Sequence, residues 1–446
     1  MNIAILAAGA AGMYCGSCMR DNALAAALMR LGHKVSLIPL YTPLKTEPKS
    51  VSHDEVFFGG VNVYLQHASG IFRKTPRAFD WLLDRQWLLK LAGRYGADTP
   101  PEQLAGLTLS LLQGEEGPAV KELRRLLAFL REQVKPDVIT LPNLMFIGVA
   151  PTLRRELKVP IVCELTGEDI FLDAMAERDR GQVREAIRKA VPSVDQFVAT
   201  CEYYANQMVD YLGVARDAID VVYPGIPGEY LREETPRRSE GKPPTVGFLA
   251  RIGPEKGLHR FIDAVLLLSK MPGMQDLKVR VAGYLGKQYE TWYAEQQARL
   301  TQAGFGGRAQ FHGEVDRPAK LELLDSLDVF SVPTTYKETK GVSVLEAMAR
   351  GVPVVQPSHG SFPEILQLSN GGVLVPPDDP TALAKAMHDL LTNPKRRQQL
   401  GDAGRQAVRA GFTDEVMARN MLKVYERVTD GLRPAGTVSA STAAPY

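Results

Sequence analysis

The most constraining feature of this sequence is a repeated alternation between short apolar runs and longer segments with helical periodicity. Most runs are rich in β-branched residues, and a segment with helical spacing usually follows each run. In the second half, the runs that predict strands are residues 245–250, 278–282, 309–311, 329–332, 352–355 and 373–375. Because parallel strands need long crossovers that helices usually provide, the alternation predicts a parallel sheet covered by helices.

The first half opens with the same alternation around a glycine-rich loop. A predicted strand over residues 2–7 precedes the loop AGAAGMYCG, then a helix over 17–31 and a strand over 34–40. This order begins a doubly wound sheet. A dinucleotide-binding fingerprint is not formed, because the glycines lack the G-x-G-x-x-G spacing and no acidic residue ends the second strand. Further strands are predicted at residues 61–66, 137–141, 160–165, 196–200 and 219–223.

The length of the chain predicts two domains, since 446 residues exceed one ordinary core. Residues 231–244 form a charged, proline-containing connector, and we place the boundary there. This gives a first domain over 1–235, with a helical insertion at about 69–130, and a second domain over 236–412. The low-complexity tail, residues 433–446, is expected to be disordered.

The composition excludes several classes of protein. A net charge of +2 gives no nucleic-acid signature, and no apolar stretch is long enough to span a bilayer. Four cysteines in a chain of this length do not form a disulfide framework, and the N-terminus lacks the pattern of a secretory signal. We therefore expect a soluble, cytoplasmic enzyme.

Charged residues follow two of the predicted strands in the second half. Ligands of open α/β sheets bind beyond the carboxyl ends of the strands, where helix N-termini also point. Arg251 and Lys256 follow the strand at 245–250, and Glu338 follows the strand at 329–332. Cations suit a diphosphate and carboxylates suit hydroxyl groups of a sugar or ribose. The combination predicts a nucleotide-sugar site.

Glu346 lies in a segment, residues 342–349, that is apolar almost all round. Such a helix is normally buried, and an ionised carboxylate inside it is costly unless a partner compensates its charge. The partner of Glu346 is either a ligand or a residue of the protein, and a buried arginine is one alternative.

These residues also carry a family resemblance. The motif R-x4-K-G (Arg251, Lys256, Gly257), followed by E-x7-E-A-M-A-x-G-x-P-V-V from Glu338, resembles the retaining glycosyltransferases of family 4. The likeness covers nearly the whole chain outside the insertion. It implies the GT-B fold, with two Rossmann-like domains that face a cleft. It also implies sugar transfer from a nucleotide-diphosphate donor with retention of configuration, and without a required metal or cofactor.

The resemblance assigns roles to the four charged residues. Arg251 and Lys256 would neutralise the leaving diphosphate. Glu338 would contact hydroxyl groups of the sugar, and Glu346 those of the ribose.

Backbone groups complete the site that the resemblance implies. The amides at Gly341 and Val342 would bind phosphate. From the first domain, the loop with Gly12 and Gly16 would close under the diphosphate, because its missing side chains let the backbone approach. The last helix, residues 413–432, would pack back on the first domain.

One departure from the family pattern concerns the strand at residues 160–165. Many members carry a histidine after this strand as a contact to the donor sugar, whereas here Thr166-Gly-Glu-Asp169 follows. Thr166, or Glu168 and Asp169, would substitute for it, or His67 would reach in from the neighbouring strand.

Two further departures lie near Glu338. Lys340 stands where small or aromatic residues are usual, so it could add a contact to phosphate. Residues 358–361, SHGS, stand where two glycines are common, and the sequence leaves their role open.

The partners that we expect are a nucleotide-sugar donor and a carbohydrate or lipid-linked acceptor. The aromatic residues of the insertion would form a core or a wall of the acceptor cleft, with peripheral membrane contact as a weaker alternative. Rival functions are a catalytically inactive nucleotide-sugar-binding protein, a GT-B epimerase or phosphorylase, and a thiol oxidoreductase built on Cys15 and Cys18. The motifs recognise groups that all donors share, so they leave open the base, the sugar and the acceptor.

Overall fold

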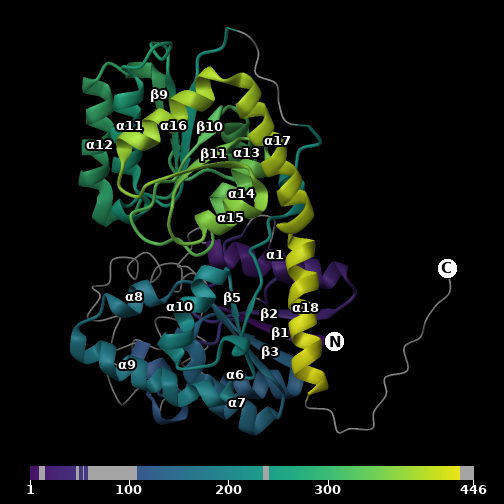
Figure 1. Ribbon diagram of the computed structural model, residues 1–446. Helices are drawn as coiled ribbons and strands as arrows, with labels where there is room; N and C mark the ends of the chain where they lie inside the picture. The colour runs from purple at the N-terminus through teal and green to yellow at the C-terminus, as the bar shows by residue number, and fades with distance from the viewer. Residues whose placement is uncertain (10–15, 47–49, 54, 59–107, 235–240, 432–446) are drawn as a thin grey trace, which may run out of the picture.

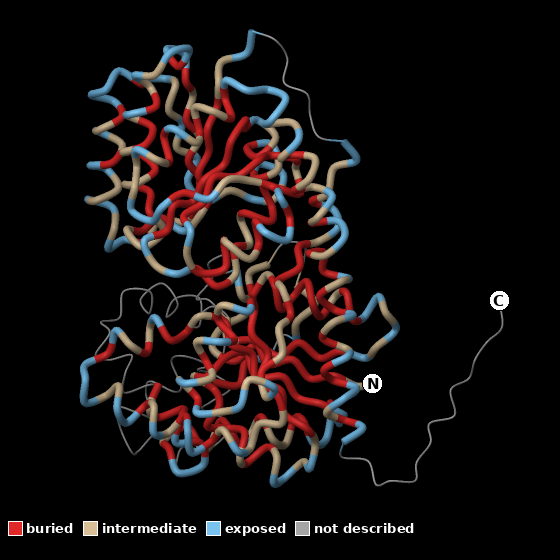
Figure 2. The backbone as a smooth tube through the Cα atoms, viewed as in Figure 1, coloured by how far each residue is buried: buried red, intermediate tan, exposed pale blue. Residues whose placement is uncertain are grey.

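The computed structural model describes residues 1–9, 16–46, 50–53, 55–58, 108–234 and 241–431. Within these ranges the chain forms two parallel six-stranded sheets, each with its own buried interior (Figures 1 and 2). The predicted α/β architecture is therefore confirmed. The predicted strand at 61–66 and the tail at 433–446 lie outside the described residues.

The first sheet has the strand order β2-β1-β3-β4-β5-β6. Its strands are β1 (Asn2–Ala7), β2 (Lys34–Pro39), β3 (Val138–Leu141), β4 (Ile161–Leu165), β5 (Gln196–Ala199) and β6 (Ile219–Val221). The order reverses between β1 and β3, so the crevice of this sheet opens beyond the end of β1. The glycine-rich loop begins there.

The second sheet has the strand order β12-β11-β10-β7-β8-β9. Its strands are β7 (Thr245–Leu249), β8 (Lys278–Ala282), β9 (Ala309–Phe311), β10 (Val329–Phe330), β11 (Val354–Pro357) and β12 (Gly372–Val375). Here the order reverses between β7 and β10. The loops after these two strands carry the charged motifs, so the topology brings both motifs to one crevice.

Helices cover both faces of each sheet (Figure 1). Those of the first half are α1 (Gly16–Arg30), α6 (Val120–Phe129), α7 (Ala150–Leu157), α8 (Asp169–Asp173), α9 (Glu177–Ala190) and α10 (Glu202–Leu212). Those of the second half are α11 (Leu258–Leu268), α12 (Glu290–Gln302), α13 (Arg317–Asp325), α14 (Val342–Ala349), α15 (Phe362–Ser369), α16 (Pro380–Thr392) and α17 (Pro394–Gly411). No helix within the described ranges has both the length and the apolar character needed to cross a bilayer.

The strand β11 starts later than the sequence predicts. The strand expected at 352–355 begins two residues later, at Val354, because the preceding Pro353 has no N–H for the ladder. Between β3 and β4 the chain forms a 3-10 helix, Leu144–Val149, which continues into α7. The part of the helical insertion that the structure describes, residues 108–130, is mostly helical.

The helix α18 (Asp414–Asp430) connects the two halves of the molecule. It leaves α17 beside the second sheet and packs along α1 of the first (Figure 1). Its buried residues Met417, Met421 and Tyr425 belong to the same apolar cluster as Ile3 and Ile5 of β1. The Tyr425 hydroxyl also lies 2.8 Å from Thr140 Oγ1 of β3. The last helix thus contributes to the core of the first sheet.

Candidate functional site

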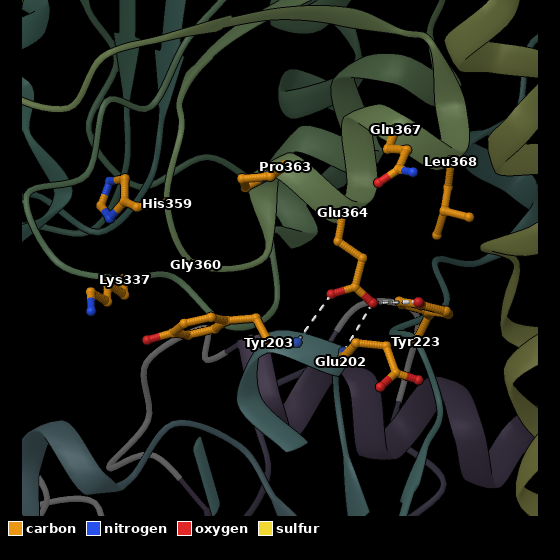
Figure 3. A pocket seen from close by; sticks show the side chains of 10 residues that line it. All are labelled: Glu202, Tyr203, Tyr223, Lys337, His359, Gly360, Pro363, Glu364, Gln367 and Leu368. Carbon is orange, nitrogen blue, oxygen red and sulfur yellow. Dashed lines mark hydrogen bonds between the residues drawn. The ribbon is translucent and has the colours of Figure 1, made fainter. Parts of the chain in front are cut away.

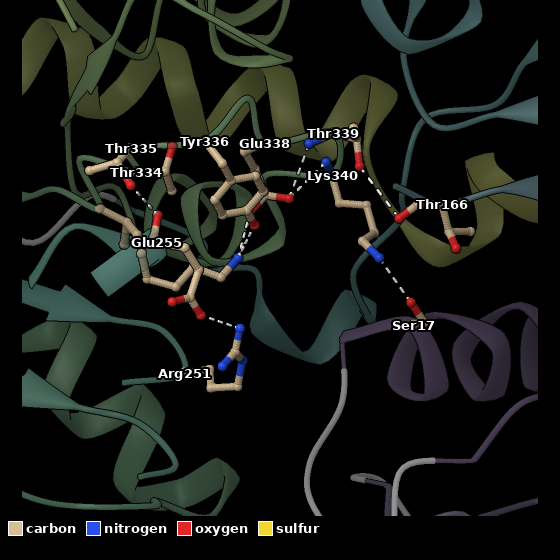
Figure 4. Close-up of polar contacts among 12 residues, drawn as sticks. Ser17, Thr166, Arg251, Glu255, Thr334, Thr335, Tyr336, Glu338, Thr339 and Lys340 are labelled. Carbon is tan, nitrogen blue, oxygen red and sulfur yellow. Dashed lines mark hydrogen bonds and ion pairs between the residues drawn. The ribbon is translucent and has the colours of Figure 1, made fainter. Parts of the chain in front are cut away.

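The loops after β7 and β10 meet through Lys256 and Glu338. The Lys256 Nζ atom lies 2.7 Å from Glu338 Oε2. The Tyr336 hydroxyl donates a 2.6 Å hydrogen bond to the same oxygen (Figure 4). Glu338 is only 8% exposed. The structure therefore joins two of the charged residues that the sequence analysis assigns to the nucleotide-sugar site.

The surroundings of Glu338 keep its carboxylate ionised. Burial alone would raise the pKa of Glu338, but the Lys256 charge and hydrogen bonds from Lys256 and Tyr336 lower the pKa well below its ordinary value. Burial, with the nearby Glu338 charge, raises the pKa of Tyr336, so its hydroxyl remains a donor. An ionised carboxylate accepts hydrogen bonds, as recognition of hydroxyl groups requires.

The other carboxylate oxygen of Glu338 faces its own backbone. Glu338 Oε1 accepts hydrogen bonds from the amides of Thr339 and Lys340, each at 3.1 Å. From the SHGS segment, the Ser361 amide donates to the Glu338 carbonyl at 2.7 Å. A Cβ at Gly360 would lie 2.3 Å from the same carbonyl oxygen. The segment whose role the sequence left open thus supports the Glu338 loop.

Glycine also lets the two loops pack together. Gly257 has φ +76°, and a Cβ there would lie 1.7 Å from the carbonyl oxygen of Pro333. Gly341, with φ +62°, starts α14. Side chains at Gly257 would force the loops apart, so this glycine fixes where Lys256 lies relative to Glu338.

Arg251 does not join the Lys256–Glu338 pair. Its guanidinium forms an ion pair with Glu255, four residues later, and its side chain is 45% exposed (Figure 4). It lies on the same loop as Lys256, but the structure gives it a different partner.

Glu346 has a partner within the protein. Glu346 is 5% exposed, and its Oε1 atom lies 2.9 Å from Nζ of Lys320 in α13. The Tyr230 hydroxyl lies 3.2 Å from the same ammonium. Burial would lower the pKa of Lys320, but the Glu346 charge raises it above its ordinary value. The protein partner of Glu346 is thus Lys320, and not the arginine considered as one alternative. The contact of Glu346 with ribose stays a prediction.

A signal in the sequence marks Lys320. It precedes Leu323 and Leu324 by three and four residues, and both leucines are buried. Residues at this spacing share one face of a helix, so Lys320 lies on the buried face of α13.

The Glu338 loop also contacts the first domain. The Lys340 Nζ atom lies 2.9 Å from Ser17 Oγ at the start of α1, and the Thr200 hydroxyl donates to the Thr339 carbonyl at 2.9 Å. The Thr339 hydroxyl lies 3.5 Å from the Thr166 carbonyl oxygen. A Cβ at Gly167 would come within 2.8 Å of Thr339 Oγ1. Two departures from the family pattern, at Thr166-Gly167 and at Thr339-Lys340, therefore touch each other.

Glu168 supports the first domain from within. Its carboxylate accepts hydrogen bonds from the amides of Leu144 (2.9 Å) and Thr166 (2.8 Å), and it is 7% exposed. Burial raises the pKa of Glu168, although the hydrogen bonds from these amides lower it and offset part of the rise. The Glu168 carboxylate thus holds the loop after β4 to the loop after β3, both within the first domain. Thr166, rather than Glu168, contacts the second domain, through Thr339.

The glycine-rich loop is described only at its ends. Gly16 is exposed at the start of α1, and Cys18 is buried in the same helix. Gly12, Cys15 and His67 lie outside the described residues. Within the ranges that the structure describes, no group of three or more His, Cys, Asp or Glu side chains is arranged to hold a metal ion.

Glu364 is a site residue whose partners the sequence did not reveal. It lies in the first turn of α15 in the second domain. Its carboxylate accepts hydrogen bonds from the Glu202 (2.9 Å) and Tyr203 (3.3 Å) amides at the start of α10, and from the Tyr223 hydroxyl (Figure 3). The N-cap residue of α10, Cys201, makes no capping hydrogen bond with its side chain. A residue of the second domain thus caps a helix of the first.

The halves of the chain match two family models. Residues 20–225 match the glycosyl transferase 4-like domain, and residues 232–407 match the glycosyl transferases group 1. The phosphatidyl-myo-inositol mannosyltransferase of Mycobacterium leprae is 34% identical over 185 residues, which are 41% of this chain and 46% of that protein. The aligned part thus spans less than half of that relative. A D-inositol 3-phosphate glycosyltransferase from Nocardioides sp. is 28% identical over 352 residues, 74% of this chain and 75% of that protein.

Solved structures with this fold extend over nearly the entire chain. Sucrose-phosphate synthase from Thermosynechococcus elongatus has a TM-score of 0.68 at 17% identity and covers 96% of this chain and 99% of its own. Anabaena HepE, solved with UDP and glucose, has a TM-score of 0.63 at 17% identity and covers 96% and 100%. The two sheets, the two matched models and the motifs agree: the chain belongs to the group 1 glycosyltransferases of family 4 and has the GT-B fold.

Proposed function

We propose that this protein transfers a sugar from a nucleotide-diphosphate donor to a carbohydrate or lipid-linked acceptor, with retention of configuration. The observation that carries the proposal is the meeting of Lys256 and Glu338 where the order of the second sheet reverses. A buried carboxylate for hydroxyl groups and a cation for phosphate stand side by side there.

The cations would stabilise the leaving diphosphate. In the proposed step the bond between the sugar carbon and the phosphate oxygen breaks, and its electron pair leaves with the diphosphate. Lys256, with Arg251 on the same loop and Lys340 on the Glu338 loop, would stabilise the growing negative charge, together with the amides at Gly341 and Val342. The acceptor hydroxyl would attack on the same face and give its proton to the departing phosphate.

The two glutamates would orient the donor. Glu338 would release its hydrogen bonds to the Thr339 and Lys340 amides and accept hydrogen bonds from sugar hydroxyls instead. The two released amides would then bind the ligand. Glu346, already neutralised by Lys320, would contact ribose hydroxyls at low cost, because its charge needs no further compensation.

The relatives support the donor class. They include a phosphatidyl-myo-inositol mannosyltransferase and D-inositol 3-phosphate glycosyltransferases, and HepE was solved with UDP and glucose. We also propose that the transfer requires no metal or cofactor and that the protein acts in the cytoplasm.

A thermal-shift screen with uridine, adenosine and guanosine diphosphate sugars tests the proposal. At least one donor should stabilise the protein and undergo slow hydrolysis, also with a chelator present, and Glu338→Ala should lose the hydrolysis. NMR of the released sugar should show the donor's anomeric configuration before mutarotation. Indifference to every donor would contradict the proposal, and tight binding without turnover would favour an inactive binding protein.

A further inference from the structure

A cavity of about 530 Å³ lies between the two domains, on the side of the Glu338 loop that faces α10. We call it the α10 cavity. The residues of its lining that matter here are Asp169, Tyr203, Asn206, Gln207, Lys337 and Thr339. Its volume lies in the range typical of small-molecule sites, about 300–1,000 Å³.

The α10 cavity adjoins the proposed reaction centre. Lys337 and Thr339 flank Glu338 in the chain and line the cavity, whereas the Glu338 side chain points to Lys256. The Thr339 amide, which binds Glu338 Oε1, therefore belongs to a residue that also forms the cavity wall. A molecule in the cavity would contact the loop that carries Glu338 from the side of the first domain, the side from which we expect the acceptor.

The wall on the first domain is a preformed network of hydrogen bonds. The Asp169 carboxylate is 6% exposed and accepts hydrogen bonds from the Tyr204 hydroxyl (2.7 Å) and from Gln207 Nε2 (2.6 Å). The Tyr203 hydroxyl donates to Gln207 Oε1 at 2.6 Å. These bonds hold the polar groups in place before a ligand arrives, which lowers the entropic cost of binding.

The chemistry of the wall suits a sugar. A half-buried tyrosine ring offers an apolar surface with a polar edge, while the carboxylate and the amide groups of Asn206 and Gln207 can bond hydroxyl groups. A phosphate group fits less well, because Asp169 would repel it. Among the residues that the structure describes, the lining contains one cation, Lys337, whose ammonium lies 5.9 Å from the Tyr203 ring centre.

A second cavity, of about 680 Å³, shares Tyr203 and Lys337 with the α10 cavity (Figure 3). Its lining adds the Tyr223 ring and the exposed Gln367. An acceptor of more than one sugar unit would have room to continue past Tyr203.

We propose that the α10 cavity binds a neutral glycosyl unit of the acceptor. This inference rests on the proposed function, and it selects a carbohydrate rather than a lipid phosphate as the group bound beside the reaction centre.

Saturation-transfer NMR on the full chain tests this inference. The probes are methyl glycosides of glucose, mannose and galactose, with inorganic phosphate as the anionic comparison. At least one glycoside should give a signal from the wild-type protein. Tyr203→Ala removes the ring, and Asn206→Phe fills the cavity from an exposed position; each should weaken the signal about tenfold or more. Asp210→Ala, also exposed on α10 but outside the cavity lining, is the matched control and should keep the signal.

The outcomes separate this inference from the proposed function. Thermal unfolding first verifies that each variant is folded. If no glycoside binds, or if both cavity variants bind it as well as the wild type, the inference is overturned. Binding of phosphate alone, lost in Lys337→Met, would also overturn it and make the cavity an anion site. Donor binding is measured separately on the wild-type protein, so its absence would refute the proposed function without bearing on these results.

Discussion

The buried pair of Lys320 and Glu346 makes a quantitative prediction about the second domain. Glu346→Gln keeps the shape of the side chain and an acceptor oxygen, but it removes the charge that neutralises the Lys320 ammonium, which is 11% exposed. Removing one partner of a buried ion pair costs about 3–5 kcal/mol, because the other charge stays desolvated. With about 2–4 °C per kcal/mol for a domain of this size, the unfolding temperature should fall by about 6–20 °C.

Calorimetry of the ligand-free protein measures this loss, and the double variant controls it. Lys320→Met combined with Glu346→Gln removes both charges and should recover most of the stability, whereas Lys320→Met alone should destabilise as strongly as Glu346→Gln. The Lys320 pKa is raised, so the contribution of the pair persists across neutral pH and is lost only at alkaline pH. An unchanged unfolding temperature in Glu346→Gln would show that the ion pair of Glu346 with Lys320 does not stabilise the second domain.

Three further predictions concern the domain contact and the Glu338 loop. Glu364→Ala removes the cap of α10 and should weaken the contact between the two domains by about 1–2 kcal/mol. Small-angle scattering should therefore show a more open molecule for Glu364→Ala than for the exposed control Gln367→Ala. Because the pKa of Glu338 is lower in the folded protein, the ionised Glu338 stabilises the fold above about pH 4.5, and this stabilisation is lost as the pH falls further. The unfolding temperatures of wild type and Glu338→Gln should therefore converge on acidification. A difference between them that does not change with pH would refute the lowered pKa. Gly257→Ala should lower the free energy of unfolding far more than Gly213→Ala. Both glycines have positive φ, but only at Gly257 would the added Cβ have backbone atoms within 4 Å. Equal losses of unfolding free energy in denaturant titrations would contradict this prediction.

The sequence was sufficient to predict the sheets because buried parallel strands are apolar on both faces. In the described ranges most strands begin and end within about two residues of the expected positions, although β11 is shifted by the proline before it. The pairing of Lys256 with Glu338 was also within reach. Both residues follow strands that flank the reversal of strand order, and loops at that position converge.

The partners across the cleft could not be predicted in the same way. Glu364 and the α10 amides are about 160 residues apart, and only the packing of one domain on the other brings them together. The same holds for the contact of Thr339 with Gly167. Lys320 is an intermediate case: its helical spacing marks it as buried, but the choice of Glu346 as its partner depends on how α13 and α14 pack.

Calorimetric titration with the donor's nucleoside diphosphate and with the free nucleoside tests the central claim most directly. Lys256→Met should weaken binding of the diphosphate about tenfold or more, which is about 1.4 kcal/mol or more, and leave binding of the nucleoside unchanged. Lys270→Met, at an exposed lysine after α11, serves as the matched control and should bind both ligands like the wild type. Equal affinity of wild type and Lys256→Met for the diphosphate would contradict the account, because Lys256 would then not face the leaving group.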